Sequence, residues 1–217
     1  MNIKQKIFNF TIMLLLTSAC GLFTTYEPAE TLPLSTLSPP ESTNTPENAG
    51  DGHLQRTDSA YQECHDYDEI RDFVSEEQCF MDLVKQDPGN FLIWGEIGRT
   101  RQLLDNWNGA LDAHFIGLAL VPNKAEEAII LQEISFDYLH LEDFQSTITY
   151  GEKALAIEEI QTTRKSHVLL YIGLAYRGSG DAINACKYIR QAYDLSLQIS
   201  YEFMIEQSGD YLPSTCP

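Results

Sequence analysis

The sequence is poor in basic residues. Its 217 residues include 14 lysines and arginines but 32 aspartates and glutamates, which gives a formal net charge of −18 at pH 7. A protein that binds nucleic acid needs a basic surface to contact phosphates, so this composition argues against such a partner. It also argues against docking of the folded surface on an anionic membrane. The acidity indicates a solvated exterior, with a specific basic partner as the alternative.

The motifs of catalysis and metal binding are also missing. The five histidines show no HxxxH or HExxH spacing, and the cysteines form no CxxC pair. No GxSxG, phosphate-binding loop or dinucleotide fingerprint occurs. The acidic run from Glu63 to Glu69 lacks the spaced oxygens and turn glycine of a calcium loop. We therefore expect no enzyme activity, no metal site and no cofactor.

A continuous apolar run stands near the N-terminus. Residues 1–19 combine Lys4 and Lys6, an apolar run that ends at Leu16, and small residues before Cys20. This layout is typical of a secretory signal peptide and is too short for a membrane span. Its end, Leu-Thr-Ser-Ala-Cys, resembles a bacterial lipoprotein processing site, which implies cleavage and lipidation at Cys20. An ordinary cleaved signal is the alternative.

Prolines are concentrated in one stretch. Five of the nine lie in residues 24–57, among serines, threonines and glutamates. Such a stretch cannot bury enough apolar surface to offset its chain entropy. We therefore expect residues 20–57 to form the anchor cysteine and a disordered linker, stiffened by proline, that holds the following domain away from a membrane.

Three stretches downstream share one frame. Started at Phe91, Ala128 and Ser166, the frame places isoleucine at its seventh position and small residues at its eighth, twentieth and twenty-seventh positions. Antiparallel helices approach closely only where side chains are small. The sixteenth position holds good N-caps for a second helix: Asn106, Asp143 and Asp181.

This frame resembles the tetratricopeptide repeat (TPR), which has a large residue, an aliphatic, three small residues and a proline where the first copy has Trp94, Ile97, Gly98, Ala110, Gly117 and Pro122. The resemblance implies an all-α fold, a TPR-type solenoid of antiparallel helix pairs. A generic helical bundle is the alternative, which apolar periodicity alone does not exclude.

The three copies cover residues 91–124, 128–161 and 166–199. Their starts are 37 and 38 residues apart, against 34 in the family. This predicts a small insertion at each joint, around residues 125–127 and 162–165. The second copy also has Gly151 where a bulky residue is usual.

Two divergent segments flank the repeats. Residues 58–90 match the frame only near their end and at Phe73, so we predict a degenerate N-terminal helix pair. Residues 200–217 predict a capping helix that ends at Ser208 and Gly209, followed by an extended tail from Pro213.

Four cysteines remain once Cys20 is assigned to the lipid. An even number in an exported chain fits two disulfides, with three possible connectivities. We favour the local pairs Cys64–Cys79 and Cys186–Cys216, with free buried thiols as the alternative. The second pair requires a bend near residues 196–200, because a tail that follows an unbroken helix barely reaches back.

The TPR resemblance implies a concave groove lined by the first helix of each pair. The sequence lacks the set of lysines and asparagines with which some repeats grip a C-terminal carboxylate. A mainly apolar trough, with Arg99 and Arg177 as its positive charges, suits a protein or peptide segment. The alternative is that its apolar residues belong to the core between repeats. The predicted groove residues are Arg99, Gln102, Gln132, Phe136, His140, His167 and Arg177.

These features predict a non-catalytic scaffold for protein–protein interaction at the bacterial cell surface or envelope. The protein would touch the membrane only through its lipid anchor, or would alternatively be secreted. The first rival is a small-molecule or peptidoglycan-fragment binder, which a deep pocket with converging polar groups would favour. The second rival is an envelope hydrolase, for which the sequence offers no nucleophile and base.

Overall fold

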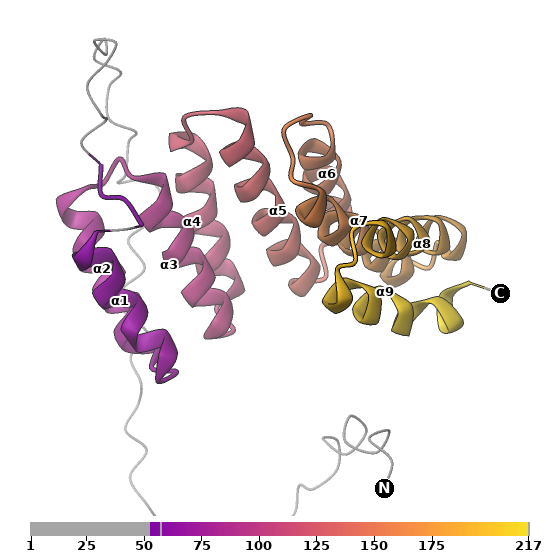
Figure 1. Ribbon diagram of the computed structural model, residues 1–217, viewed down its shortest axis with the longest axis horizontal. Helices are drawn as coiled ribbons and strands as arrows, with labels where there is room; N and C mark the ends of the chain where they lie inside the picture. The colour runs from indigo at the N-terminus through magenta and orange to yellow at the C-terminus, as the bar shows by residue number, and fades with distance from the viewer. Residues whose placement is uncertain (1–52, 57, 217) are drawn as a thin grey trace, which may run out of the picture. The chain divides into compact units, whose positions relative to one another are not determined.

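The structure is a computed structural model that describes residues 53–56 and 58–216. All regular structure in these residues is helical (Figure 1). The helices are α1 (Ser59–Glu69), α2 (Phe73–Gln86), α3 (Phe91–Leu103), α4 (Trp107–Leu120), α5 (Lys124–His140), α6 (Phe144–Leu155), α7 (Thr162–Gly178), α8 (Ala182–Gln198) and α9 (Glu202–Thr215). The predicted signal peptide, Cys20 and most of the predicted linker lie outside the described residues.

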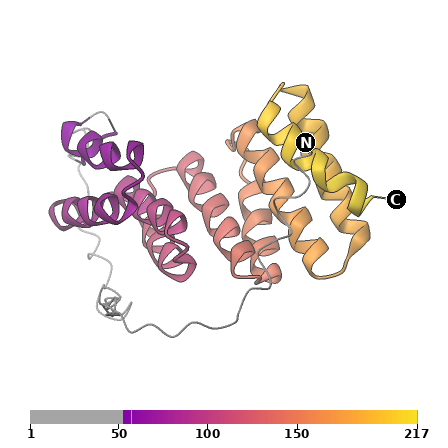
Figure 2. The same cartoon turned by 90° about the horizontal axis from the view of Figure 1, so that it is seen from below.

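The helices pack as consecutive pairs. Each helix contacts its neighbours in sequence, α5 also contacts α7, and α7 also contacts α9 (Figure 2). The first helices of the pairs therefore follow one another along one side, which we term the inner face. This is the predicted all-α solenoid of helix pairs. Within the described part of the chain, no helix has both the length and the apolar character needed to cross a membrane.

Every pair is joined by the same short turn. The residue before the cap has a positive φ of between 56° and 83°; these residues are Arg71, Asp105, Glu142 and Gly180. The next residue accepts a hydrogen bond from the backbone N–H three positions on, and these caps are Asp72, Asn106, Asp143 and Asp181. The three predicted caps are confirmed. Because α1 and α2 share the turn, the N-terminal pair is built like the others although its sequence matches poorly.

The extra residues between copies do not form separate insertions. Helices α5 and α7 each have 17 residues, against 13 in α3. The residues placed in the joints form the first turn of each longer helix. In α5 this turn is stabilised by two interactions. The side chain of Asn123 accepts a hydrogen bond from the N–H of Glu126, and the carboxylates of Glu126 and Glu127 interact favourably with the positive end of the helix dipole.

Small and large residues alternate across the pairs. A Cβ atom added at Gly98 would lie 2.2 Å from Nε2 of His114, so the glycine makes room for that ring. The second copy reverses the arrangement, with Ser135 on the first helix and Gly151 on the second. A Cβ atom at Gly151 would lie 2.7 Å from Cγ1 of Ile172, which fills the space from the next pair. The unusual glycine is therefore compensated by packing between repeats.

Residues before the predicted end of the linker contact the helical domain. Residues 53–56 were assigned to the linker, but His53 Nδ1 lies 2.5 Å from Asp87 Oδ1, and the Leu54 N–H donates to Asp87 Oδ2 at 3.0 Å. The side chain of Asn90 donates to the Leu54 carbonyl at 2.8 Å. These bonds tie residues 53 and 54 to the loop between α2 and α3, so the predicted linker boundary at residue 57 is wrong.

The C-terminal helix is longer than predicted. Helix α9 runs through Ser208, Gly209 and Pro213 to Thr215, so the predicted stop and extended tail are wrong. Ser208 is buried, and its hydroxyl donates to the Met204 carbonyl within the helix. Apolar burial of α9 against α7 and α8 thus outweighs the local breaking tendency of these residues.

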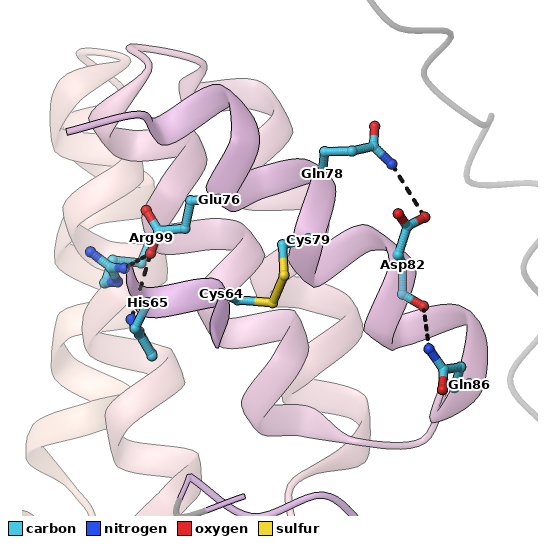
Figure 3. The surroundings of a disulfide bond; sticks show 8 residues. All are labelled: Cys64, His65, Glu76, Gln78, Cys79, Asp82, Gln86 and Arg99. Carbon is cyan, nitrogen blue, oxygen red and sulfur yellow. Dashed lines mark hydrogen bonds and ion pairs between the residues drawn. A yellow bond between two sulfur atoms is a disulfide. The ribbon is translucent and has the colours of Figure 1, made fainter. Parts of the chain in front are cut away.

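Disulfide bonds join Cys64 to Cys79 and Cys186 to Cys216, the same local pairs that the spacing favoured. The first links α1 to α2, with Cα atoms 5.4 Å apart (Figure 3). The second links α8 to the end of α9. The chain bends between these helices at Ser200, whose φ is 54°, within the range where the bend was predicted.

Candidate functional site

The residues predicted to line the groove all lie on first helices of the pairs. They are Arg99 and Gln102 on α3, Gln132, Phe136 and His140 on α5, and His167 and Arg177 on α7. The structure places six of them in three environments, which are a charged cluster, a set of polar links between helices and a row of aromatic rings, and it places Arg177 apart from all three.

Arg99 is held by carboxylates of its own fold. Its Nε donates to Glu96 Oε2 at 2.8 Å, and its Nη1 donates to Asp68 Oδ2 at 3.3 Å. Its Nη2 donates to Glu76, whose side chain is completely buried. The charge of Arg99 is therefore neutralised inside the protein. This corrects the expectation that Arg99 supplies positive charge to a bound segment.

The same cluster lies beside the α1–α2 disulfide, where His65, Glu76 and Arg99 point toward one another (Figure 3). His65 Nδ1 is 3.6 Å from Glu76 Oε1. His65, Asp68 and Glu76 offer potential metal-ligand atoms within 4.8 Å of one another. The guanidinium of Arg99 already bonds to two of these three residues. The fold itself thus supplies the cation that these carboxylates require.

The two buried glutamates of the cluster differ in their acidity. Burial raises the pKa of Glu76 above its ordinary value, although Arg99 opposes this. Burial also disfavours ionisation of Glu96, but hydrogen bonds from Tyr61 and Arg99 outweigh it and lower the pKa of Glu96. The Tyr61 hydroxyl donates to Glu96 Oε1 at 2.6 Å. The cluster is therefore an internal network of ion pairs and hydrogen bonds centred on Arg99.

The predicted groove glutamines connect neighbouring helices. Gln102 Nε2 donates to Asp137 Oδ1 at 2.8 Å, and Asp137 Oδ2 lies 2.6 Å from Nδ1 of His114. Asp137 and His114 are completely buried. Gln132 Oε1 accepts from Arg164 Nη1 at 3.2 Å. These bonds join α3, α4, α5 and α7, so both glutamines hold successive pairs in register.

Aromatic rings form a continuous row across α5, α7 and α9. The ring of Phe136 lies 4.5 Å from His140 and 5.0 Å from Tyr171, measured between centroids. His167 continues the row, 6.1 Å from Tyr171 and 5.6 Å from Tyr201. We term this row the aromatic strip; its members are Trp107, Phe136, His140, His167, Tyr171, Tyr201 and Phe203.

The strip is open to solvent at both ends. At one end His140 stacks on Trp107, with ring centroids 3.8 Å apart and an interplanar angle of 7°. At the other end Phe203 lies 6.2 Å from His167 and is 55% exposed. His140 is also exposed, and the remaining members are half-buried. The rings thus pack on the fold and still offer surface for contact.

The strip is uncharged at neutral pH. Burial lowers the pKa of His140, and burial together with the charge of Arg164 lowers the pKa of His167. Burial raises the pKa of Tyr171. His167 Nε2 lies 3.1 Å from the Tyr201 hydroxyl, which links α7 to α9. Burial therefore favours the neutral form of His140, His167 and Tyr171.

Arg177 lies outside the aromatic strip. Its side chain is exposed, and its guanidinium lies 5.1 Å from the ring centroid of Tyr211 on α9. Unlike Arg99, it contacts an aromatic face at the surface of the protein.

Sequence reasoning found three members of the strip, Phe136, His140 and His167. A signal for Tyr171 was present, because Phe136 with His140 and His167 with Tyr171 are pairs spaced by four on successive first helices, and such residues share a helix face. The other three members begin α4 or belong to the cap, where the groove positions of the repeat do not reach.

A cavity of about 230 Å³ lies on the inner face beside Arg99. It is formed between α3, α5 and α7, and its apolar lining includes Leu92 and Ile129. Its charged lining residues are Arg56, Glu96, Arg99, Glu126, Glu133 and Arg164.

No family model matches the chain, and no curated protein matches it. Among solved structures, the chain is similar to a crystal structure of MamA at 16% identity and a TM-score of 0.53, covering 73% of this chain and 93% of that one. A second MamA structure gives 16% identity and a TM-score of 0.54, covering 72% and 87%. The likeness supports the TPR-type solenoid fold.

Proposed function

We propose that this protein is a non-catalytic scaffold that binds a segment of a partner protein along the inner face of its solenoid. The observation that carries the proposal is the aromatic strip, whose rings run from the start of α4 across α5 and α7 to α9 and are exposed at both ends. Aromatic side chains dominate the energetics of many protein interfaces because they offer a large contact area at a low entropic cost. A long open row suits a polypeptide better than a compact ligand.

A small molecule or peptidoglycan fragment is the second candidate ligand. It would use the cavity beside Arg99, whose volume of about 230 Å³ is below the roughly 300–1,000 Å³ of most ligand pockets. The main polar groups there are already engaged, since Arg99 bonds to Glu96 and Arg164 lies 3.9 Å from Glu133. A second hollow, of about 420 Å³ between α7 and α8, is wide open to solvent. These features favour the protein partner.

A crosslinking pull-down from the native envelope tests the proposal. The test variant is Phe203→Ser with His140→Ala, because both side chains are exposed and their loss should leave the fold intact. The matched control is Ile183→Ser, which removes a side chain that is 84% exposed on α8, outside the strip. We expect the wild type and the control to capture a partner that the test variant loses. Equal capture by all three proteins would refute binding at the strip.

We further propose that the protein is exported and tethered to a membrane through lipidated Cys20, with secretion as the alternative. The two disulfide bonds support an oxidising compartment. Replacement Cys20→Ala should release the protein from the membrane fraction and abolish labelling by a fatty-acid analogue. Unchanged fractionation and labelling of this variant would refute the anchor.

A further inference from the structure

Acidic side chains border the aromatic strip. Asp105 and Asp137 lie within electrostatic reach of its end on α5. Glu133 contributes to the raised pKa of Tyr171 at the centre of the strip. Glu202 stands between Tyr201 and Phe203 at the start of α9. These carboxylates place negative charge along the margin of the strip, and Arg164 is the basic residue that acts on the same rings.

The arginine that reaches the strip is already engaged. Arg164 acts on His167 and Tyr171, but its Nη1 donates to Gln132 at 3.2 Å and lies 3.9 Å from Glu133. Asp137 is likewise bonded internally, to Gln102 and His114. Asp105 and Glu202 are exposed at the two ends of the strip. A ligand therefore meets aromatic faces with exposed carboxylates at either end.

We infer that the strip binds an extended peptide segment that presents arginine side chains to the rings. This inference rests on the proposed function and specifies the chemistry of the partner. A guanidinium group stacks flat on an aromatic face and pairs with a carboxylate through two parallel hydrogen bonds. A lysine ammonium is a compact, strongly hydrated charge that lacks this planar fit. The combination of neutral rings and nearby acids thus selects arginine.

The spacing of the rings fits an extended chain. Neighbouring ring centroids from Phe136 through Tyr171 and His167 to Phe203 are 5.0, 6.1 and 6.2 Å apart. In an extended peptide, side chains on one face recur every two residues, or about 6.8 Å. The ring spacings are shorter than this repeat, so successive rings lie within reach of the long side chains of alternate residues. A single-stranded nucleic acid also stacks on aromatic rows, but the net charge of −18 repels its phosphates.

Three synthetic peptides of equal length test the inference on the disulfide-bonded protein. The first carries arginine at alternate positions, the second carries lysine there, and the third carries uncharged citrulline. Binding is followed by the anisotropy of a labelled peptide and by tryptophan fluorescence, which reports Trp107 in the strip together with the buried Trp94. We expect the lysine peptide to bind at least about fivefold more weakly, because it loses the stacking contribution, and the citrulline peptide to bind more weakly still. Equal binding of the arginine and lysine peptides would overturn the inference, because it would indicate charge attraction alone.

Variants of the strip locate the binding. Phe203→Leu keeps an apolar side chain of similar size but removes a ring, whereas Phe203→Tyr keeps the ring. We expect the arginine peptide to lose at least about threefold in affinity on Phe203→Leu and to bind normally to Phe203→Tyr. Glu202→Gln should weaken binding in the same range, and Glu152→Gln, at an exposed position on α6, should not. Identical affinities for all four variants would place the peptide elsewhere and overturn the inference.

The two proposals fail in different ways. If the pull-down captures a partner at the strip and no arginine peptide binds, the arginine preference is wrong and the scaffold function stands. If the arginine peptide binds at the strip and the pull-down captures nothing, the peptide specificity stands and the proposed envelope partner fails.

Discussion

The two ends of the inner face use charge in opposite ways. Around α3, buried carboxylates are neutralised by Arg99, and the cluster is closed on itself. Across α5, α7 and α9, the rings are neutral and remain partly exposed, with acids at their margin. The first arrangement stabilises the fold, and the second leaves surface available for recognition.

The contrast shows that a repeat position does not determine a role. Arg99 and Phe136 both occupy the ninth position of their copies. Arg99 faces Asp68 and the buried Glu76 of the preceding pair, whereas Phe136 faces rings on α4, α5 and α7. The neighbours, rather than the frame, decide whether the ninth residue holds the fold together or contributes to the strip.

Removal of the guanidinium at the closed end should have the largest effect. Arg99→Ala leaves Glu76 and Glu96 buried without their cation, and breaking such a buried pair costs about 3–5 kcal/mol. The matched variant Arg177→Ala removes an exposed cation from the face of Tyr211 and should cost less than about 1 kcal/mol. Urea unfolding followed by circular dichroism measures both. Similar losses of unfolding free energy for the two variants would contradict the conclusion that the Arg99 cluster stabilises the fold.

Removal of either disulfide should lower the free energy of unfolding by a similar amount, whereas only the second should affect peptide binding. Cys64→Ala with Cys79→Ala opens a 15-residue link and should cost about 3 kcal/mol in unfolding free energy. Cys186→Ala with Cys216→Ala opens a 30-residue link and should cost a similar amount, on the order of 3–4 kcal/mol.

Binding of the arginine peptide should distinguish the two disulfide variants. The first pair lies far along the chain from the strip, so its loss should leave the affinity of the folded protein unchanged. The second pair holds α9, which carries part of the strip, so its loss should weaken binding. Weaker binding after removal of the first pair alone would show that the two ends are coupled.

Glycine substitutions should have intermediate effects. A Cβ atom at Gly98 would meet the ring of His114, which is fixed by its bond to Asp137. A Cβ atom at Gly151 would meet Ile172, an apolar side chain that has other rotamers. Overpacking typically costs about 1–3 kcal/mol, and we expect Gly98→Ala to lie at the upper end and Gly151→Ala at the lower.

Thermal or urea unfolding of both glycine variants checks the order, and Ile172→Val should partly restore Gly151→Ala. A greater loss of stability from Gly151→Ala than from Gly98→Ala would show that the His114–Asp137 pair makes room for a methyl group more readily than Ile172 does.

The fold was predictable because its determinants are local and repeated. Asn106, Asp143 and Asp181 cap helices by bonding to backbone three residues away, and small residues at fixed positions set the approach of paired helices. The first turns of α5 and α7 were wrongly predicted to be insertions, because the repeat frame assumes a first helix of constant length, whereas α5 and α7 are longer than α3.

The site was less predictable because it depends on contacts between distant residues. Arg99 bonds to Glu76, 23 residues away, and no spacing rule pairs them. Tyr201 and Phe203 join the strip only because the chain bends at Ser200 and returns α9 to α7. Only four members of the strip could be predicted from the sequence. Phe136 and His140 are four residues apart on one helix, and so are His167 and Tyr171.

Mild acidification should have the smallest effect, confined to the open end. Burial and Arg164 lower the folded-state pKa of His167 below its unfolded value near 6.5. The unfolded chain therefore binds more protons as the pH falls below about 6.5, and His167 contributes stability that is present above this pH and lost below it. His140 follows the same direction, with its shift opposed by Asp137 and Asp105. Glu76 has the opposite sign, since its raised pKa favours the folded state at acid pH.

The variant His167→Gln isolates the histidine contribution, because glutamine keeps a hydrogen-bonding group near Tyr201 but does not titrate. We expect the unfolding free energy of the wild type to fall more steeply than that of the variant between pH 7 and pH 5. Since Glu76 and every other titrating group is common to both proteins, the difference between the two slopes reports His167 alone. Parallel slopes would mean that His167 accepts a proton in the folded strip as readily as in the unfolded chain, and the strip would then become cationic at mildly acid pH and repel an arginine-bearing segment.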